Sequence, residues 1–390
     1  MLVFFLQPLA FGSWLPRIPD IQVRLGAGPA ELALALLGLP IGTLLTLPFA
    51  GPIVARIGAR AAIRIGFLVF LAVVMLPAFS VHIAMLFGAL LLTGMAMSVL
   101  ELGLNIEADE IERSSGRSIM STCHGCWSLG MTAGSLIGVG LAAFGLPPQV
   151  SVALVALVVL VPAQLAARAL PAGPRHEAIS ASKPAGIFMP GPLLLGICVF
   201  VLGTTIVEGA AADWSAIYLK QAFAADAAGA GIGYAAFAAM VTVGRLAGDR
   251  LKRRFGAVPV ARSCVATALL GVALVVLSPA YGPALLGFAL AGLGVSVCFP
   301  LGVTAAAGIG GRLPAANVAM LSLIALCGFL LGPPVIGFIA EHGGLRLGLA
   351  CLLPGLGLSV LLAGRLRPQA SPVAAPLDAA PAGIAAGEMP

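Results

Sequence analysis

Charged residues are scarce in this sequence. Asp, Glu, Lys and Arg make up 9% of its 390 residues, whereas hydrophobic residues make up 60%. A soluble domain has about 25% charged residues, so a chain of this composition cannot hide its apolar surface from water. The sequence also lacks a GxxxxGK[ST] phosphate loop, a nucleophile triad and a cluster of metal ligands. We therefore predict no ATP hydrolysis, no enzyme activity, no cofactor and no metal site.

The net charge of +6 does not indicate a nucleic-acid partner, because no basic patch is interleaved with aromatic residues. The first residues, MLVFFLQPLAFGSW, lack the basic start of a cleaved signal peptide, and we interpret them as a first spanning helix that a short leader precedes. Seven cysteines lie in apolar runs, where they act as small hydrophobes. The pair in CHGC, Cys123 and Cys126, has no second pair to suggest zinc or redox chemistry.

Long apolar runs predict the fold class. They are continuous rather than alternating, so they indicate membrane-spanning helices and not a β-barrel. Twelve such runs are present, with centres near Leu9, Leu44, Val73, Leu92, Gly134, Val158, Gly203, Ala238, Leu269, Leu290, Leu326 and Leu356. The chain is therefore predicted to be an all-α integral membrane protein with twelve transmembrane helices.

The basic residues predict the orientation. With a cytoplasmic N-terminus, 17 of the 21 Lys and Arg residues fall in inside segments. The four in outside segments are Arg17, Arg24, Lys220 and Arg346. The positive-inside rule thus places both termini in the cytoplasm. The polar segment 171–188 divides a bundle of residues 1–170 from a second bundle of residues 189–367, and residues 368–390, rich in Pro and Ala, are predicted to be a disordered cytoplasmic tail.

The two halves of the sequence resemble each other. Trp14 corresponds to Trp214 at an offset of 200, and Gly58 corresponds to Gly256 at an offset of 198. The dipeptide Ser98–Val99 also recurs at an offset of 198. Such offsets indicate two parallel six-helix repeats, an architecture known among transporters. Glycines spaced by four in the fifth and eleventh helices predict close packing where the halves meet.

Two loops resemble the signature of the major facilitator superfamily. They read GPIVARIGAR (Gly51–Arg60) and GRLAGDRLKRRFG (Gly244–Gly256). Ala55 stands where that signature usually has aspartate. Four further motifs, SWLPRIPDI, ELGLNIEADEIE, HGCWSLG and EGAAADWSAIYL, resemble the bacterial inner-membrane YbjJ-like subgroup of this superfamily. The resemblance implies the major facilitator fold, two pseudo-symmetric bundles and a location in the inner membrane.

Glu101 is the first candidate for a functional residue. It lies in an apolar run, where an acid costs about 2.5–3.5 kcal/mol on insertion scales. Asn105 follows four residues later and shares its helix face. The E-x-x-x-N pattern resembles that of proton-coupled fucose permeases, in which the acid is associated with proton coupling. A structural acid paired with a neighbouring polar group is the alternative.

Three more ionisable residues lie in predicted spans. Glu208 is a candidate for binding a proton, a cationic substrate or a hydroxyl group. His124 is a candidate proton relay that approaches Asn105 or Glu107, or else a histidine bonded to a backbone carbonyl. Asp213 lies nearer the outer end, and it is a candidate gating residue that braces the outer loop through Lys220 or Arg17.

Polar and aromatic candidates complete the predicted site. Trp14, Trp127 and Gln7 are substrate-binding candidates, although helix packing would also explain them. Asp249, with Arg245 or Arg250, is predicted to form a closing contact at the inner end, and the alternative is that these charges only set topology.

These residues predict a monomeric secondary active transporter in the lipid bilayer. A small polar solute, sugar-like or another metabolite, binds between the halves, and proton symport through Glu101 and Glu208, with His124, is the leading hypothesis. Proton-antiport export of a drug or metabolite is an alternative within transport. A membrane receptor or scaffold that does not transport is an alternative of another class.

Overall fold

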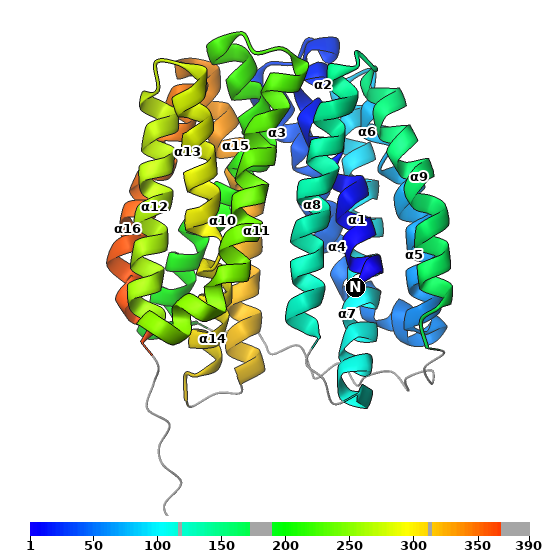
Figure 1. Cartoon of the computed structure of the whole chain (residues 1–390), viewed down its shortest axis with the longest axis vertical. Helices are drawn as coiled ribbons and strands as arrows, with labels where there is room; N and C mark the ends of the chain where they lie inside the picture. Colours follow the sequence, from blue (N-terminus) through cyan, green and yellow to red (C-terminus); the bar gives the residue numbers. More distant parts are fainter. Residues whose placement is uncertain (116–118, 172–188, 311–313, 368–390) are drawn as a thin grey trace, which may run out of the picture.

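The structure, a computed structural model, describes residues 1–115, 119–171, 189–310 and 314–367. All regular secondary structure in these ranges is helical. Two groups of helices stand side by side, one built from α1 to α9 and the other from α10 to α16 (Figure 1). The predicted tail and nearly all of the predicted linker, residues 172–188, lie outside the described residues.

The first group holds the first six predicted spans. Its elements are α1 (Leu2–Gly12), η1 (Leu15–Arg17), α2 (Ile18–Leu25), α3 (Pro29–Leu36), α4 (Gly38–Ile57), α5 (Ala59–Val73), α6 (Leu76–Phe79), α7 (Ile83–Ser115), α8 (Met120–Ala143) and α9 (Pro148–Arg168). Proline starts several of these pieces, because its missing N–H is tolerated in a first helical turn. The first span is thus α1, η1 and α2 in succession, interrupted near Pro16 and Pro19.

The second group holds the last six predicted spans. Its elements are α10 (Pro192–Phe223), α11 (Ala227–Phe255), α12 (Ala257–Leu277), α13 (Tyr281–Val295), α14 (Cys298–Ala307), α15 (Pro314–Ala350), α16 (Leu352–Leu362) and η2 (Ala363–Leu366). The helix α15 is broken at Gly344, whose φ of 75° and ψ of 165° suit glycine and end the eleventh span.

The prediction of twelve spans is confirmed. Ten helical stretches of the described residues are long and apolar enough to cross a membrane, and one of them, Ala316–Leu366, has 51 residues. As a single helix it would measure about 77 Å, more than twice the roughly 30 Å of a hydrocarbon core. It contains two spans that reverse at Gly344, and the broken first span completes the twelve. Each predicted centre falls within a helix.

Glycines set the closest helix contacts inside each bundle. A Cβ on Gly134 of α8 would lie 2.1 Å from the Leu9 carbonyl oxygen of α1, and Gly130 meets Phe5 in the same way. In α15, Gly328 packs against α10. The two helices do lie where the halves meet, as expected, since α8 contacts α11 and α15 contacts α3. Their glycines mostly face helices of their own bundle, and Gly337 packs against the other bundle, at Ala33.

We expect Gly134→Ala to destabilise the fold. The added methyl group meets a backbone carbonyl that cannot move alone, and such overpacking costs about 1–3 kcal/mol. The matched control is Gly140→Ala, also in α8, where a Cβ meets nothing within 4 Å. Thermal unfolding of the purified protein should show a lower Tm for Gly134→Ala alone. Equal melting of both variants would contradict this packing argument.

Candidate functional site

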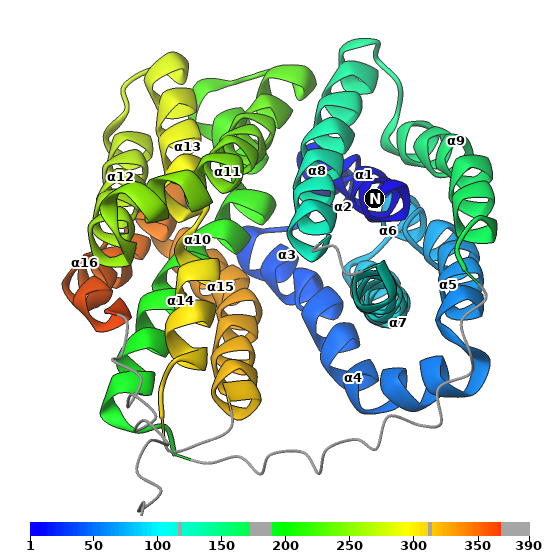
Figure 2. The ribbon, with the colours of Figure 1, turned by 60° about the horizontal axis from the view of Figure 1, so that its bottom comes forward.

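The two bundles meet through α8 and α11, which run along adjoining faces (Figure 2). We call the end of the molecule where α4, α9 and α11 finish the basic end, since Arg56, Arg168 and Arg253 lie in the last turns of these helices. The opposite end, where α2 and α10 finish, is called the far end. Functional groups are described from the middle of the bundles outward.

Arg245 joins the bundles near the middle. It lies in α11, ten residues or about 15 Å from the last residue of that helix. Its Nη1 donates to Ser128 Oγ of α8 at 2.6 Å, and its Nη2 pairs with Glu208 Oε1 of α10 at 3.3 Å. Its Nε donates to the Ser296 carbonyl oxygen at 3.4 Å. One guanidinium group therefore contacts both bundles.

A narrow pocket, with room for about one water molecule, adjoins this guanidinium. Residues of α8, α10 and α11 line it, namely Trp127, Ser128, Met131, Glu208, Tyr234, Phe237, Ala238, Val241 and Arg245. The Tyr234 and Phe237 rings stack with centroids 6.2 Å apart, and Trp127 lies on the opposite bundle. The wall thus combines aromatic faces with a carboxylate–guanidinium pair, which suits a small polar ligand.

The predicted residues Glu101, Gln7 and Trp127 come together on the N-terminal bundle. Trp127 Nε1 donates to Gln7 Oε1 at 3.2 Å, and the Glu101 carboxyl group lies beside Trp127. Gln7 is fully buried, and its Nε2 has no hydrogen-bond partner in the described part of the chain. Asn105 Nδ2 donates to the Glu101 backbone carbonyl at 2.8 Å, which leaves the Glu101 carboxyl group free of the amide.

His124 and Trp14 lie apart from this cluster. His124 is exposed and meets Phe4 edge-on with ring centroids 5.9 Å apart. No hydrogen bond joins it to Asn105 or Glu107 among the described residues. Trp14 is 3% exposed, does not line the cavity, and has no partner for its indole nitrogen within the described ranges. Its surroundings are those of a packing residue.

The predicted gating residues have other neighbours than expected. Arg245 pairs with Glu208, and over the described ranges Asp249 forms no ion pair with Arg245 or Arg250. The Arg245 side chain therefore lies inside the bundle contact and not in the inner loop to which the charge count assigned it. Asp213 is not braced by Lys220 or Arg17, because both of those cations pair with another acid.

That acid is Asp20, which the sequence analysis missed. Arg17 Nε lies 3.0 Å from Asp20 Oδ2, and Lys220 Nζ of the other bundle lies 3.6 Å from Asp20 Oδ1. Arg17 also donates to the Leu146 carbonyl oxygen at 2.7 Å and to Ser151 Oγ at 3.2 Å. The stretch PRIPD could have indicated the Arg17–Asp20 pair, since an acid three residues after an arginine shares its helix face.

A second contact joins the bundles at the far end. The Ala30 backbone N–H, in the first turn of α3, donates to Glu341 Oε2 of α15 at 3.2 Å. A Cβ on Gly337 would lie 2.4 Å from the Ala33 Cβ, so α15 and α3 touch closely. Between the described parts of the bundles, no hydrogen bond or ion pair lies nearer the basic end than that of Arg245 with Ser128. The described residues thus join the two bundles at the far end as well as at Arg245.

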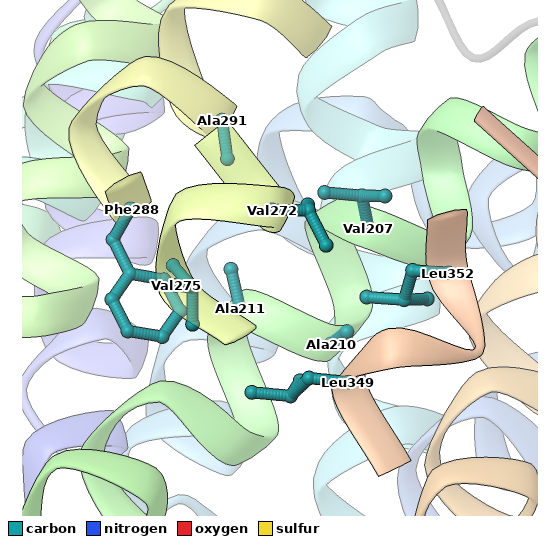
Figure 3. A pocket seen from close by; sticks show the side chains of 9 residues that line it. All are labelled: Val207, Ala210, Ala211, Val272, Val275, Phe288, Ala291, Leu349 and Leu352. Atoms are coloured by element: carbon teal, nitrogen blue, oxygen red, sulfur yellow. The ribbon is translucent and has the colours of Figure 1, made fainter. Parts of the chain in front are cut away.

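Another cavity lies inside the C-terminal bundle, between α10, α12, α13, α15 and α16 (Figure 3). Its walls are apolar side chains only, among them Val207, Phe288 and Leu352. An apolar internal void offers a polar solute no hydrogen bond. This cavity is therefore a packing defect of one bundle and not part of the candidate site.

Known proteins that are similar to this chain along most of its length include a transporter and a membrane protein. An uncharacterized MFS-type transporter of Yersinia pestis is 32% identical over 355 residues, covering 90% of each chain. The membrane protein MosC of Rhizobium meliloti is 28% identical over 345 residues, covering 88% of this chain and 83% of its own.

Solved transporters share the fold. A mutant of the nucleoside transporter NupG has a TM-score of 0.73 at 18% identity, covering 94% of this chain and 97% of its own. A bacterial homolog of the human lysosomal transporter Spinster, inward-facing and occupied, has a TM-score of 0.71 at 15% identity, covering 93% and 94%. Residues 1–306 match the Major Facilitator Superfamily, and the chain belongs to this family of membrane transporters.

Proposed function

We propose that this transporter moves a small polar solute, sugar-like or another metabolite, across the bacterial inner membrane by alternating access and proton symport. One observation carries the proposal: charged and hydrogen-bonding side chains of both bundles converge on the cavity between α8, α10 and α11. Trp127 and Ser128 come from one bundle, and Glu208, Tyr234 and Arg245 come from the other. A solute held there contacts both moving parts.

The partners of the two central acids support different roles for them. Glu208 has a permanent counter-charge in Arg245, 3.3 Å away. Glu101 has no ion-pair partner among the described residues, and its carboxyl group lies beside Trp127. An acid in a membrane helix without a counter-charge is a candidate to take up and release a proton. We therefore propose Glu101 as the proton carrier and Glu208 as the group that positions Arg245.

The contacts between the bundles support alternating access. One ion pair, one hydrogen bond and close packing join the bundles at the far end, and the described hydrogen bonds between bundles reach as far as Arg245 toward the basic end. Because seventeen of the basic residues fall in predicted inside segments, we propose that the basic end is cytoplasmic and that this conformation opens inward. Membership of the YbjJ-like subgroup, the domain boundaries and the monomeric state stay predictions.

Glu101→Gln should abolish proton-driven accumulation in proteoliposomes. The amide keeps the size of the side chain but cannot take up and release a proton. With a solute selected by its thermal stabilisation of the protein, we expect uptake under an inward pH gradient to fall at least about tenfold, equivalent to about 1.4 kcal/mol. Exchange without a gradient should persist.

The control for this experiment is Glu31→Gln, an exposed change at the far end that preserves the cap on Gly28. It should accumulate solute as the unmodified protein does. Full accumulation by Glu101→Gln would remove the proposed proton carrier.

Glu208→Gln and Arg245→Gln should each lower thermal stability, by about 1–3 kcal/mol, because each leaves one charge unpaired in the interior. The double variant should lose less than the sum, since both charges are then gone. Thermal unfolding in lipid nanodiscs of the unmodified protein, the two single variants and the double variant measures this double-mutant cycle. Ser128→Ala, which removes the bond between bundles and a local bond to the His124 carbonyl oxygen but no charge, is the comparison. Additive losses would show that Glu208 and Arg245 act independently.

Lys220→Met should loosen the far end, because it removes the cation that ties Asp20 to the other bundle. Spin labels at Val81 and Leu277, both exposed near the far end, report the separation in a background without native cysteines. We expect an added population at longer distance. The distribution should be unchanged in Glu31→Gln, and an unchanged distribution in Lys220→Met would argue against the ion pair as a closing contact.

A further inference from the structure

Three sulfur atoms meet where α1 begins. Cys123 Sγ of α8 lies 3.7 Å from Met1 Sδ, and Cys126 Sγ lies 4.0 Å from the same Met1 Sδ. The two cysteines are three residues apart in α8 and therefore share one helix face. The cysteines of CHGC indicated no metal site on their own, because nothing in the sequence brings Met1, 122 residues before Cys123, to the same place.

These three sulfurs differ in their exposure. Cys123 is 1% exposed, whereas Cys126 is partly accessible and Met1 is 44% exposed. Both cysteines are free thiols and not a disulfide. An ion can therefore approach from the side of Met1 and meet thiols that are available to bind it, with Cys123 at the buried side of the cluster.

Packing alone does not require cysteine at these positions. The offset of 198 that relates the two halves maps Cys123 to Leu321 and Cys126 to Ile324. Leu321 is 0% exposed, so the second bundle fills the corresponding buried place with an aliphatic side chain. The sulfur cluster is thus a feature of the first bundle that the repeated fold does not explain.

The spacing of the sulfurs fits one metal ion. Three ligands in a plane around an ion, each at a metal–sulfur bond of about 2.3 Å, lie about 4.0 Å from one another. The distances of 3.7 and 4.0 Å from Met1 Sδ match this arrangement. Thiolate and thioether sulfurs are soft ligands that select Cu(I). Zn²⁺ takes four ligands from Cys, His and acids, and among the described residues no three such side chains gather as a metal site.

We propose that Met1, Cys123 and Cys126 form a binding site for one Cu(I) ion. The ion takes the place of the two thiol protons, which pass to solvent, so two thiolates and one thioether ligate it. Because Met1 precedes α1 and both cysteines lie in α8, the bound ion ties the first span to the fifth. The site shares no residue with the candidate pocket, so it goes beyond the proposed function and does not depend on it.

Copper competition on the full-length protein in nanodiscs tests this site. The protein is incubated without oxygen with Cu(I) and increasing amounts of the chelator bathocuproine disulfonate. We expect the protein to retain about one ion, and Cys123→Ser and Cys126→Ser should each weaken its affinity at least about tenfold, since each removes a ligand. Cys327→Ser, at a partly accessible cysteine of α15, is the matched control and should bind as the unmodified protein does.

The thioether is tested with a short added leader that supplies the start of translation. In this background Met1→Leu should bind Cu(I) about tenfold more weakly than the same protein with Met1 kept. Both should have the same Tm without metal, because leucine keeps most of the volume of the side chain. Since Met1 is partly exposed, this comparison decides the matter even where a cysteine variant fails to fold.

X-ray absorption at the copper edge gives the number of ligands directly. The unmodified protein should show three sulfur ligands at about 2.3 Å from the ion. No retained copper in the unmodified protein, retention that survives in both cysteine variants, equal affinity with Met1 and with leucine, or a two-coordinate copper spectrum would overturn the three-sulfur site.

Discussion

A permanent positive charge in an apolar interior is the constraint on which the centre of this transporter depends. The guanidinium of Arg245 does not lose its proton, so its charge must be compensated at every stage of a transport cycle. Glu208 supplies the opposite charge, and Ser128 Oγ and the Ser296 carbonyl oxygen accept further hydrogen bonds from the guanidinium. Since Ser128 belongs to the other bundle, the solvation of Arg245 is tied to the contact between bundles.

The contacts along the bundle interface differ in what they cost to break. Thr132 and Thr242, about one turn beyond Arg245, share a neutral hydrogen bond of 3.2 Å. The Asp20–Lys220 pair at the far end is partly exposed, and water replaces such a partner at little cost. The Arg245 side chain is exposed to a similar degree, and its partner Ser128 is buried. The interface therefore combines charged and neutral hydrogen bonds along its length.

The fold followed from the sequence because hydropathy and basic residues are local signals. Twelve spans needed only the lengths of apolar runs, whereas the continuation of the first span through η1 and α2 was not predicted. Contacts between the two bundles were harder to predict from the sequence. Arg245 was assigned to a loop because a run of basic residues follows it, yet α11 continues ten residues further. Asp20 was missed because its partner Lys220 lies 200 positions away.

The candidate site was predictable in its residue types and not in their pairing. An acid in an apolar run marked Glu101 and Glu208 alike, and nothing in the sequence showed that only Glu208 has a guanidinium beside it. The glycine spacing correctly predicted close contacts, but it could not show which helix each stripe packs against, because spacing gives a face and not its partner. Tertiary contacts decide which side chains pair with each other, as they do for the hydrogen bond between Trp127 and Gln7.

The different partners of the two central acids give a physical basis for coupling. Moving an uncompensated charge through an apolar contact is unfavourable, so the bundles rock most easily when each acid is neutralised. Arg245 does this permanently for Glu208. On the proposed function a proton does it for Glu101. A protein whose Glu101 has released its proton then resists closing, and this ties the rocking of the bundles to proton uptake.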